Sequence, residues 1–80
     1  MGTFTELQTM LTGKFDVKLD LIHTDSKLAD LGLDSLGIAE LVFDIDEKYG
    51  IEIPEDDLEF QTTLGEAVAL VDRLRAAKAA

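Results

Sequence analysis

Ser35 is the residue of this chain whose chemistry depends most on its surroundings, and it lies in the stretch LADLGLDSLGIAELVF. A serine here could cap a helix, act as a nucleophile or accept a covalent group. An activated serine needs a base within hydrogen-bond reach, usually a histidine held by a third group. The only histidine is His23, and the glycine that precedes the serine of a nucleophile elbow by two residues is missing. We therefore expect no catalytic residues in this chain.

The acidic residues that follow raise the question of a metal site. DIDEKYGIEIPE begins like a calcium-binding loop, with Asp44 and Asp46 at its start and Glu55 as its twelfth residue. Lys48 stands where the third oxygen ligand belongs, however, and Tyr49 where the sharp turn needs glycine. The chain also lacks cysteine, which excludes a thiolate metal site and a disulfide. We predict no metal site.

Apolar residues at helical spacing predict the elements that position Ser35. Capping boxes mark two helix starts, TFTE with Thr3 as N-cap and TLGE with Thr63. Gly50 can end the central helix, and Pro54 suits the first turn of a short one. The predicted helices are residues 4–15, Asp34 or Ser35 to Tyr49, 54–60, and a last helix that begins at residue 64.

A long crossover joins the first two helices. KFDVKLDLI within it alternates apolar and charged residues, a pattern that alone is typical of a half-buried strand. Only IEI at residues 51–53 could pair with it, so we predict that residues 16–24 form a connection whose apolar side chains lie on the core. Asp25 or Ser26 can then cap a short turn that Gly32 ends. The prediction is one all-α domain over residues 1–80, a small four-helix bundle with three longer helices and a short third one.

Composition and charge limit the classes of function. Leu, Ile, Val and Phe supply 26 of the 80 residues, enough for one compact core but not for a deep enzyme cleft as well. Seventeen acidic and seven basic residues give a net charge of −10, which disfavours nucleic acid and anionic membranes as partners. No apolar run reaches membrane-spanning length, and the N-terminus lacks a signal-peptide pattern. We expect a small cytoplasmic protein without membrane insertion.

The predicted central helix carries two different faces. One is an ordinary core stripe, formed by Ile38, Leu41, Val42, Ile45 and Tyr49. The opposite stripe, called the docking face below, combines two apolar side chains with three carboxylates: Leu36, Glu40, Phe43, Asp44 and Glu47. This combination suits a basic partner, because charge steers the encounter and apolar side chains contribute contact area. The alternative is that Phe43 packs under a neighbouring loop.

A helix that begins at Asp34 or Ser35 gives the serine a second possible role. Capping by either side chain would stabilise the helix by about 1 kcal/mol. The free N–H groups and the dipole at a helix N-terminus also favour an anion, so a serine oxygen there is well placed to carry a phosphate. Gly32 leaves the approach open, and the docking face begins beside it. A modification site next to a docking face suits a passive substrate of other enzymes.

On these residues the chain resembles the acyl carrier proteins. The similarity includes the family's Asp-Ser-Leu motif as Asp34, Ser35 and Leu36, and it extends through IEIP and TTLGEAV over nearly the whole chain. The resemblance implies that a magnesium-dependent phosphopantetheinyl transferase attaches 4′-phosphopantetheine from coenzyme A to Ser35, with Asp34 assisting recognition. The terminal thiol of that cofactor would hold an acyl group as a thioester.

The resemblance further implies a non-catalytic, monomeric carrier that presents acyl groups to fatty-acid, polyketide or lipid-modifying enzymes. The docking face would meet basic patches on the transferase and on acyl-transfer and chain-elongation enzymes. Gly37 departs from the family, which usually has a polar residue there, and predicts a looser first turn of the helix.

Three alternatives to an acyl carrier are considered. The first is a carrier of aminoacyl or peptidyl groups, including D-alanyl, although Leu33 stands where such carriers often have a second glycine. The second is an unmodified acidic module in which Ser35 is only a cap. The third, a calcium sensor, is disfavoured by the broken ligand pattern, and we expect no calcium-dependent change in circular dichroism that magnesium does not also give.

Overall fold

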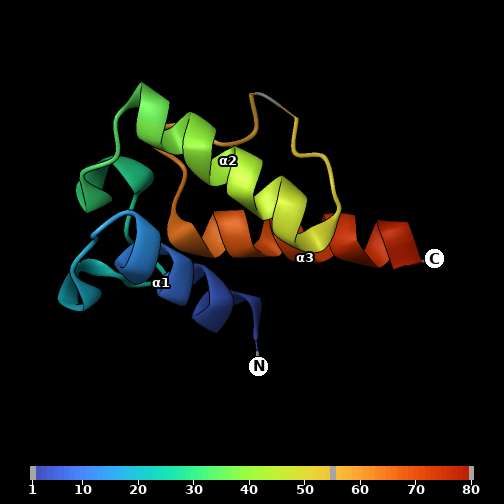
Figure 1. The fold of residues 1–80 in the computed structure, drawn as a ribbon, viewed down its shortest axis with the longest axis horizontal. Helices are drawn as coiled ribbons and strands as arrows, with labels where there is room; N and C mark the ends of the chain where they lie inside the picture. Colours follow the sequence, from blue (N-terminus) through green and yellow to red (C-terminus); the bar gives the residue numbers. More distant parts are fainter. Residues whose placement is uncertain (1, 55, 80) are drawn as a thin grey trace.

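The computed structural model describes residues 2–54 and 56–79, and over these ranges the chain is helical without a strand (Figure 1). Its α-helices are α1 (Thr3–Lys14), α2 (Ser35–Tyr49) and α3 (Leu64–Ala79). Two short 3₁₀ helices, η1 (Leu19–Leu21) and η2 (Leu28–Leu31), lie in the crossover between α1 and α2. The predicted all-α class is confirmed. No helix in the described ranges combines the length and the apolar character needed to cross a membrane.

The segment between α2 and α3 differs from the prediction. Pro54 and residues 56–60 form no helix: the described part of the segment consists of turns, bends and irregular backbone, and the Asp57 N–H donates to the Pro54 carbonyl at 3.0 Å. The predicted short helix over residues 54–60 and the four-helix bundle are therefore not confirmed; Glu55 lies outside the described residues. Leu58 is the buried side chain of this described segment. A single buried leucine leaves too narrow an apolar face to hold a helix on the core.

Thr3 does not cap α1, which corrects the first predicted capping box. Gly2 is the N-cap, and Thr3 is already helical and buried. The Thr3 hydroxyl donates to Asp72 of α3 and accepts a hydrogen bond from Arg75 Nη1 at 3.2 Å. The local pattern fails because α3 supplies stronger, charged partners for this hydroxyl.

The second capping box and both glycine stops are confirmed. The Thr63 N–H donates to Glu66 Oε1 at 2.8 Å, and the Glu66 N–H donates to the Thr63 hydroxyl at 3.1 Å. Gly50 follows α2 with a φ of 63°, and Gly32 follows η2 with a φ of 82°. These left-handed conformations suit glycine, which has no Cβ to clash with the backbone. The N-cap of η2 is Lys27, and not Asp25 or Ser26 as predicted.

The crossover packs on the core through only part of its apolar residues. Val17 and Ile22 are buried as predicted, whereas Leu19 and Leu21 of η1 are 61% and 45% exposed. Asp16 adopts a φ of 58° and reverses the chain, so that the Val17 N–H donates to Leu11 O at 3.0 Å. The single turn of η1 leaves both of its leucines exposed, because a short 3₁₀ helix on the surface can pack only one of its faces against the core.

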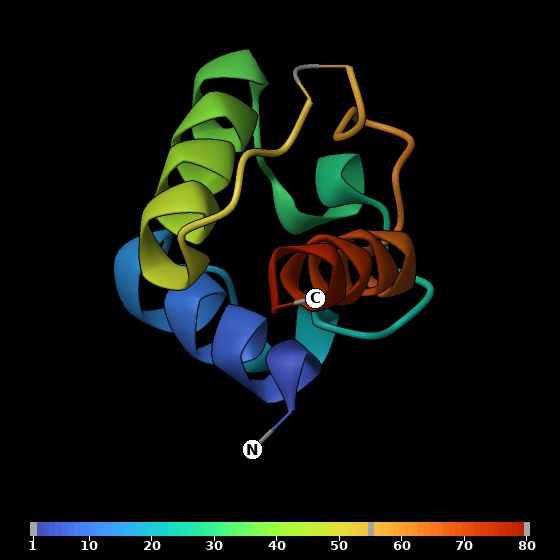
Figure 2. The same cartoon turned by 90° about the vertical axis from the view of Figure 1, so that its right-hand side faces the viewer.

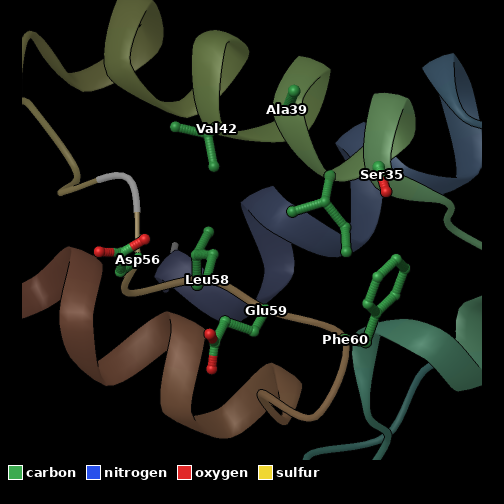
Figure 3. A pocket seen from close by; sticks show the side chains of 8 residues that line it. Ser35, Ala39, Val42, Asp56, Leu58, Glu59 and Phe60 are labelled. Atoms are coloured by element: carbon green, nitrogen blue, oxygen red, sulfur yellow. The ribbon is translucent and has the colours of Figure 1, made fainter.

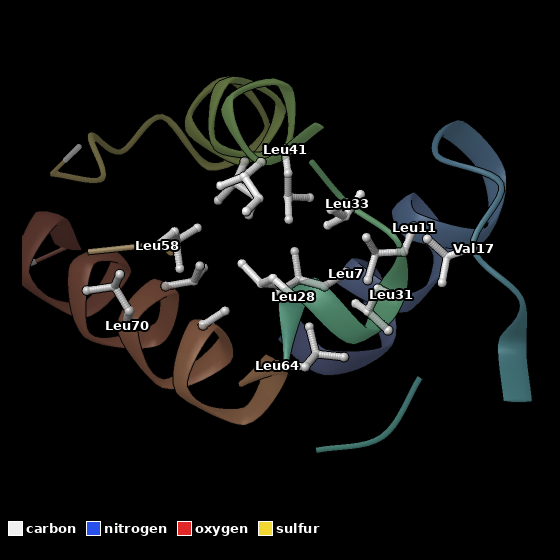
Figure 4. Packing of buried hydrophobic residues seen from close by; sticks show 14 of the residues in the cluster. Leu7, Leu11, Val17, Leu28, Leu31, Leu33, Leu41, Leu58, Leu64 and Leu70 are labelled. Carbon is white, nitrogen blue, oxygen red and sulfur yellow. The ribbon is translucent and has the colours of Figure 1, made fainter. Parts of the chain in front are cut away.

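The core lies where the three α-helices and η2 meet (Figures 2 and 4). In Figure 2 the view runs nearly along α3, with α1 and α2 on one side of it. The predicted core stripe of α2 is confirmed, with Ile38, Leu41 and Ile45 buried and Val42 and Tyr49 partly buried against the same cluster. The largest fully buried side chains come from all three α-helices and from η2: Leu7, Leu11, Leu28, Leu41, Ile45, Leu64 and Val71.

Tyr49 ties the three α-helices together at the end of α2 away from Ser35. Its hydroxyl donates to Glu6 of α1, and the Arg75 guanidinium of α3 lies 4.4 Å from the centre of its ring. Lys78 Nζ also donates to the Tyr49 carbonyl at 3.4 Å. Burial and the hydrogen bond to Glu6 raise the pKa of Tyr49 to about 12. The same hydrogen bond lowers the pKa of Glu6.

Candidate functional site

Asp34, and not Ser35, caps α2. Asp34 has an extended backbone, and its Oδ1 accepts a hydrogen bond from the Gly37 N–H at 2.7 Å. A Cβ on Gly37 would lie 3.3 Å from that same oxygen and 3.3 Å from Leu33 Cδ2. Glycine at this position therefore leaves room for the carboxylate to approach the backbone closely. The first turn of α2 is closed by this cap, and the looser first turn expected from Gly37 stays a prediction.

Ser35 follows the cap as the first residue of α2, and its side chain is exposed. Within the described residues, no hydrogen bond of its hydroxyl is recorded. The hydroxyl of Ser26, the only other serine of the chain, makes two hydrogen bonds. Its Oγ donates to Leu21 O at 2.7 Å and accepts from the His23 N–H at 3.1 Å. The Ser35 hydroxyl is therefore the serine hydroxyl that the fold leaves available for chemistry.

His23 is held within the crossover. Its Nε2 lies 2.9 Å from the Asp20 carbonyl oxygen, which makes this ring nitrogen the donor. It is not among the side chains around the pocket beside Ser35. The described contacts thus give Ser35 no histidine partner of the kind that activates a serine nucleophile.

A pocket of about 480 Å³ opens beside Ser35, between α2 and the segment that precedes α3 (Figure 3). Ser35 and Phe60 lie at one end of it, and Val42 and Asp56 at the other (Figure 3). Its walls are mainly apolar, with two carboxylates on the side of the segment: Ser35, Ile38, Ala39, Val42, Asp56, Leu58, Glu59 and Phe60. The sequence analysis missed this pocket. The available signal was LEF, where Leu58 and Phe60 interrupt an acidic run.

The docking face divides into an exposed part and a paired part. Leu36 and Phe43 are 66% and 61% exposed, and Glu40 and Glu47 are exposed beside them. Phe43 therefore does not pack under a loop, which was the alternative interpretation of this face. Exposed apolar side chains flanked by carboxylates are what an encounter with a basic, partly apolar surface requires.

Asp44 belongs to the paired part of the docking face. Both of its carboxylate oxygens lie 2.8 Å from Lys14 Nζ, at the end of α1. The Asp44 side chain is only 16% exposed, while that of Lys14 is 59% exposed. The hydrogen bond to Asp44 raises the pKa of Lys14, and the charges of Asp44, Glu40 and Glu47 add to the shift. The sequence analysis did not foresee this ion pair, because its partners are 30 residues apart.

The acids of α2 do not form the loop of a calcium site. Asp44 and Asp46 lie inside a helix that continues to Tyr49, and Asp46 Oδ1 accepts a hydrogen bond from the Ile53 N–H at 3.0 Å. Among the residues that the structure describes, no cluster of three or more His, Cys, Asp or Glu side chains is arranged to hold a metal ion.

The arrangement at Ser35 fits a phosphate ester that bears a long organic tail. The hydroxyl is exposed at the N-terminus of α2, where the backbone dipole favours negative charge. The adjoining pocket offers an apolar surface to whatever is attached. The exposed side chains of the docking face begin one residue further along, at Leu36.

Comparison with known proteins agrees with this chemistry. Residues 5–71 match the family described as "Phosphopantetheine attachment site". The chain is also 36% identical over 75 residues to an acyl carrier protein of Sulfurovum sp. (strain NBC37-1), an alignment that covers 92% of this chain and 100% of that protein.

Proposed function

The chain belongs to the acyl carrier proteins of the phosphopantetheine-attachment family, and from this premise we propose that it carries acyl groups on an arm attached to Ser35. The cofactor of the family is 4′-phosphopantetheine. When attached, it supplies the terminal thiol that holds an acyl group as a thioester, a group that the cysteine-free chain does not have. The carrier itself catalyses no step and is acted on by its partners.

The observation that carries this proposal is the contrast between Asp34 and Ser35. The Asp34 carboxylate caps α2, so the serine is not needed as the cap, and its exposed oxygen is available to react. In the attachment step, that oxygen forms a phosphodiester with the phosphorus next to the pantetheine of coenzyme A. The bond from this phosphorus to the second phosphate breaks, 3′,5′-ADP leaves, and the proton of the hydroxyl passes to the transferase or to water.

The partners that we propose are of two kinds. A phosphopantetheinyl transferase binds at the start of α2, where Asp34 contributes to its recognition, and its basic surface also contacts the docking face. Acyl-transfer and chain-elongation enzymes with basic patches bind the docking face, whose exposed apolar side chains are Leu36 and Phe43. Fatty-acid, polyketide and lipid-modifying pathways all use this chemistry. The monomeric state and the cytoplasmic location stay predictions.

A thiol assay tests the carrier function directly. The chain has no cysteine, so a thiol titrated in the purified protein after incubation with coenzyme A, magnesium and a broad-specificity transferase belongs to the cofactor. We expect about one thiol per chain, in line with the single available serine. Loading with an acyl group should block that thiol, and hydroxylamine, which cleaves thioesters, should restore it. A folded protein that gains no thiol with several transferases would contradict the proposal.

A further inference from the structure

Lys14 stands at the edge of the docking face where α1 meets α2. It reaches from the end of α1 and places its Nζ 2.8 Å from both carboxylate oxygens of Asp44. The lysine is the more exposed partner of the pair, with 59% of its side chain accessible against 16% for the aspartate. A molecule that approaches α2 from this side therefore meets an ammonium group and not the carboxylate behind it.

The other exposed side chains of α2 are arranged around this ion pair by helical spacing, since residues three and four apart share a face. Ser35 and Ala39 line the pocket, on the opposite edge of the helix from Asp44. The middle of the stripe carries the exposed side chains Leu36, Glu40, Phe43 and Glu47.

Charge is distributed unevenly across this surface. At the α1 edge, the negative charge of Asp44 is cancelled by Lys14, and the exposed Lys48 offsets the charge of the Glu6 carboxylate of α1. In the middle, Glu40 and Glu47 are exposed and form no ion pair with a described residue.

At the pocket edge the charge is negative again. Asp56 and Glu59 are exposed, and both line the pocket beside Ser35. The carboxylates without a described ion pair thus lie in the middle of the stripe and at the pocket edge, and the paired one lies at the α1 edge.

We infer that Lys14 is an internal counter-ion that withholds Asp44 from partners and displaces the cationic side chains of a docking enzyme toward Glu40, Glu47 and the pocket edge. The inference rests on the proposed function and specifies the partner surface. That surface has an apolar socket for Leu36 and Phe43, with its lysine or arginine side chains to one side of the socket. A like charge at the α1 edge repels cations there, so Lys14 weakens the electrostatic attraction of a basic partner on that side.

Kinetics of attachment at two salt concentrations test this role. The probe is a basic, broad-specificity phosphopantetheinyl transferase, assayed with the full chain as wild type, Lys14→Met and Lys14→Met/Asp44→Asn. Methionine keeps the length and helix propensity of lysine without its charge. Lys18→Met is the matched control, because Lys18 is also exposed and makes no ion pair with a described residue. Thermal melts establish that each variant is folded.

We expect Lys14→Met to raise kcat/KM about threefold at about 0.01 M NaCl, since an exposed charge contact is worth up to about a fivefold change. At about 1 M NaCl, where charges are screened beyond about 3 Å, the two proteins should converge. The double variant should return to near the wild-type value, because the uncovered carboxylate is gone again. Lys18→Met should change kcat/KM less than Lys14→Met does.

Two results would overturn the inference while leaving the carrier function intact. One is modification of the wild type with an unchanged or lowered kcat/KM for Lys14→Met, which would show that Lys14 is indifferent or contacts the partner itself. The other is a gain that persists in the double variant, which would show that Asp44 is not involved. Failure of the wild type to bind or react with the transferase would instead overturn the proposed function, and this inference with it.

Discussion

Separate replacement of Asp34 and Ser35 distinguishes a helix cap from an attachment site. Asp34 Oδ1 accepts the Gly37 N–H at 2.7 Å, whereas the Ser35 hydroxyl has no recorded partner among the described residues. Asp34→Ala should lower the free energy of unfolding by about 1 kcal/mol, the usual cost of losing an N-cap. For a domain of this size, that loss corresponds to a fall of about 4–8 °C in melting temperature.

Ser35→Ala should leave the free energy of unfolding within about 0.5 kcal/mol of the wild type, as is usual for surface substitutions. Ser26→Ala is the matched control, since it removes the same atom from a serine that makes two hydrogen bonds, at 2.7 and 3.1 Å. It should cost about 1 kcal/mol or more.

The assay is urea denaturation of the unmodified protein, followed by circular dichroism, with the denaturant slope checked for constancy. The order expected is a clear loss for Asp34→Ala and Ser26→Ala and almost none for Ser35→Ala. A loss for Ser35→Ala equal to that for Asp34→Ala would show that the serine caps α2 and would refute the separation of roles.

Three further results are expected. Because the pKa of Tyr49 is raised to about 12 from its usual 10.0, the unfolded chain loses this proton at a lower pH than the folded chain, so the free energy of unfolding should fall as the pH rises from about 10 to 12. In Tyr49→Phe that part of the pH dependence should disappear. A pH profile of stability that is the same in Tyr49→Phe and wild type would contradict the assignment. Gly13→Ala should stabilise the protein by about 0.5–1 kcal/mol, since a Cβ there meets nothing within 4 Å. Gly65→Ala should destabilise it by about 1–3 kcal/mol, since its Cβ would lie 2.5 Å from Thr24 Cγ2. Equal denaturation midpoints for the two variants would argue against this packing. The net charge of −10 should make the melting temperature rise with NaCl, and a melting temperature independent of salt would count against self-repulsion.

The features that the sequence predicts well have causes within a few residues. Three of these features are the N-cap of α2 at Asp34, its C-cap at Gly50 and the capping box of α3. Each depends on residues at most three positions from their partner or on the conformational freedom of glycine. Core stripes are equally local, because one helical face repeats every three to four residues. Such signals were enough to locate Ser35 at an exposed helix N-terminus and to define the docking face.

The errors come from contacts between distant parts of the chain. Thr3 does not cap α1 because its hydroxyl donates a hydrogen bond to Asp72, 69 residues away, and Glu6 accepts a hydrogen bond from Tyr49, 43 residues away. Asp44 is paired across 30 residues with Lys14, which no spacing rule foresees. In each case a tertiary partner decides where a side chain points, and periodicity carries no information about such partners.

The pocket beside Ser35 also required the fold. It forms because the segment of residues 56–60 lies along α2, which the prediction of a short helix did not describe. Leu58 is buried and holds that segment on the core, and Phe60 is left at the mouth of the pocket near Ser35 (Figure 3).

The most direct test of the central claim is the intact mass of the protein after incubation with coenzyme A, magnesium and a phosphopantetheinyl transferase. The chain has two serines, so wild type, Ser26→Ala and Ser35→Ala cover both positions. We predict that wild type and Ser26→Ala each gain the mass of one phosphopantetheine and that Ser35→Ala gains nothing. A gain on folded Ser35→Ala, or no gain on folded wild type across several transferases, would contradict the assignment of Ser35 as the attachment site.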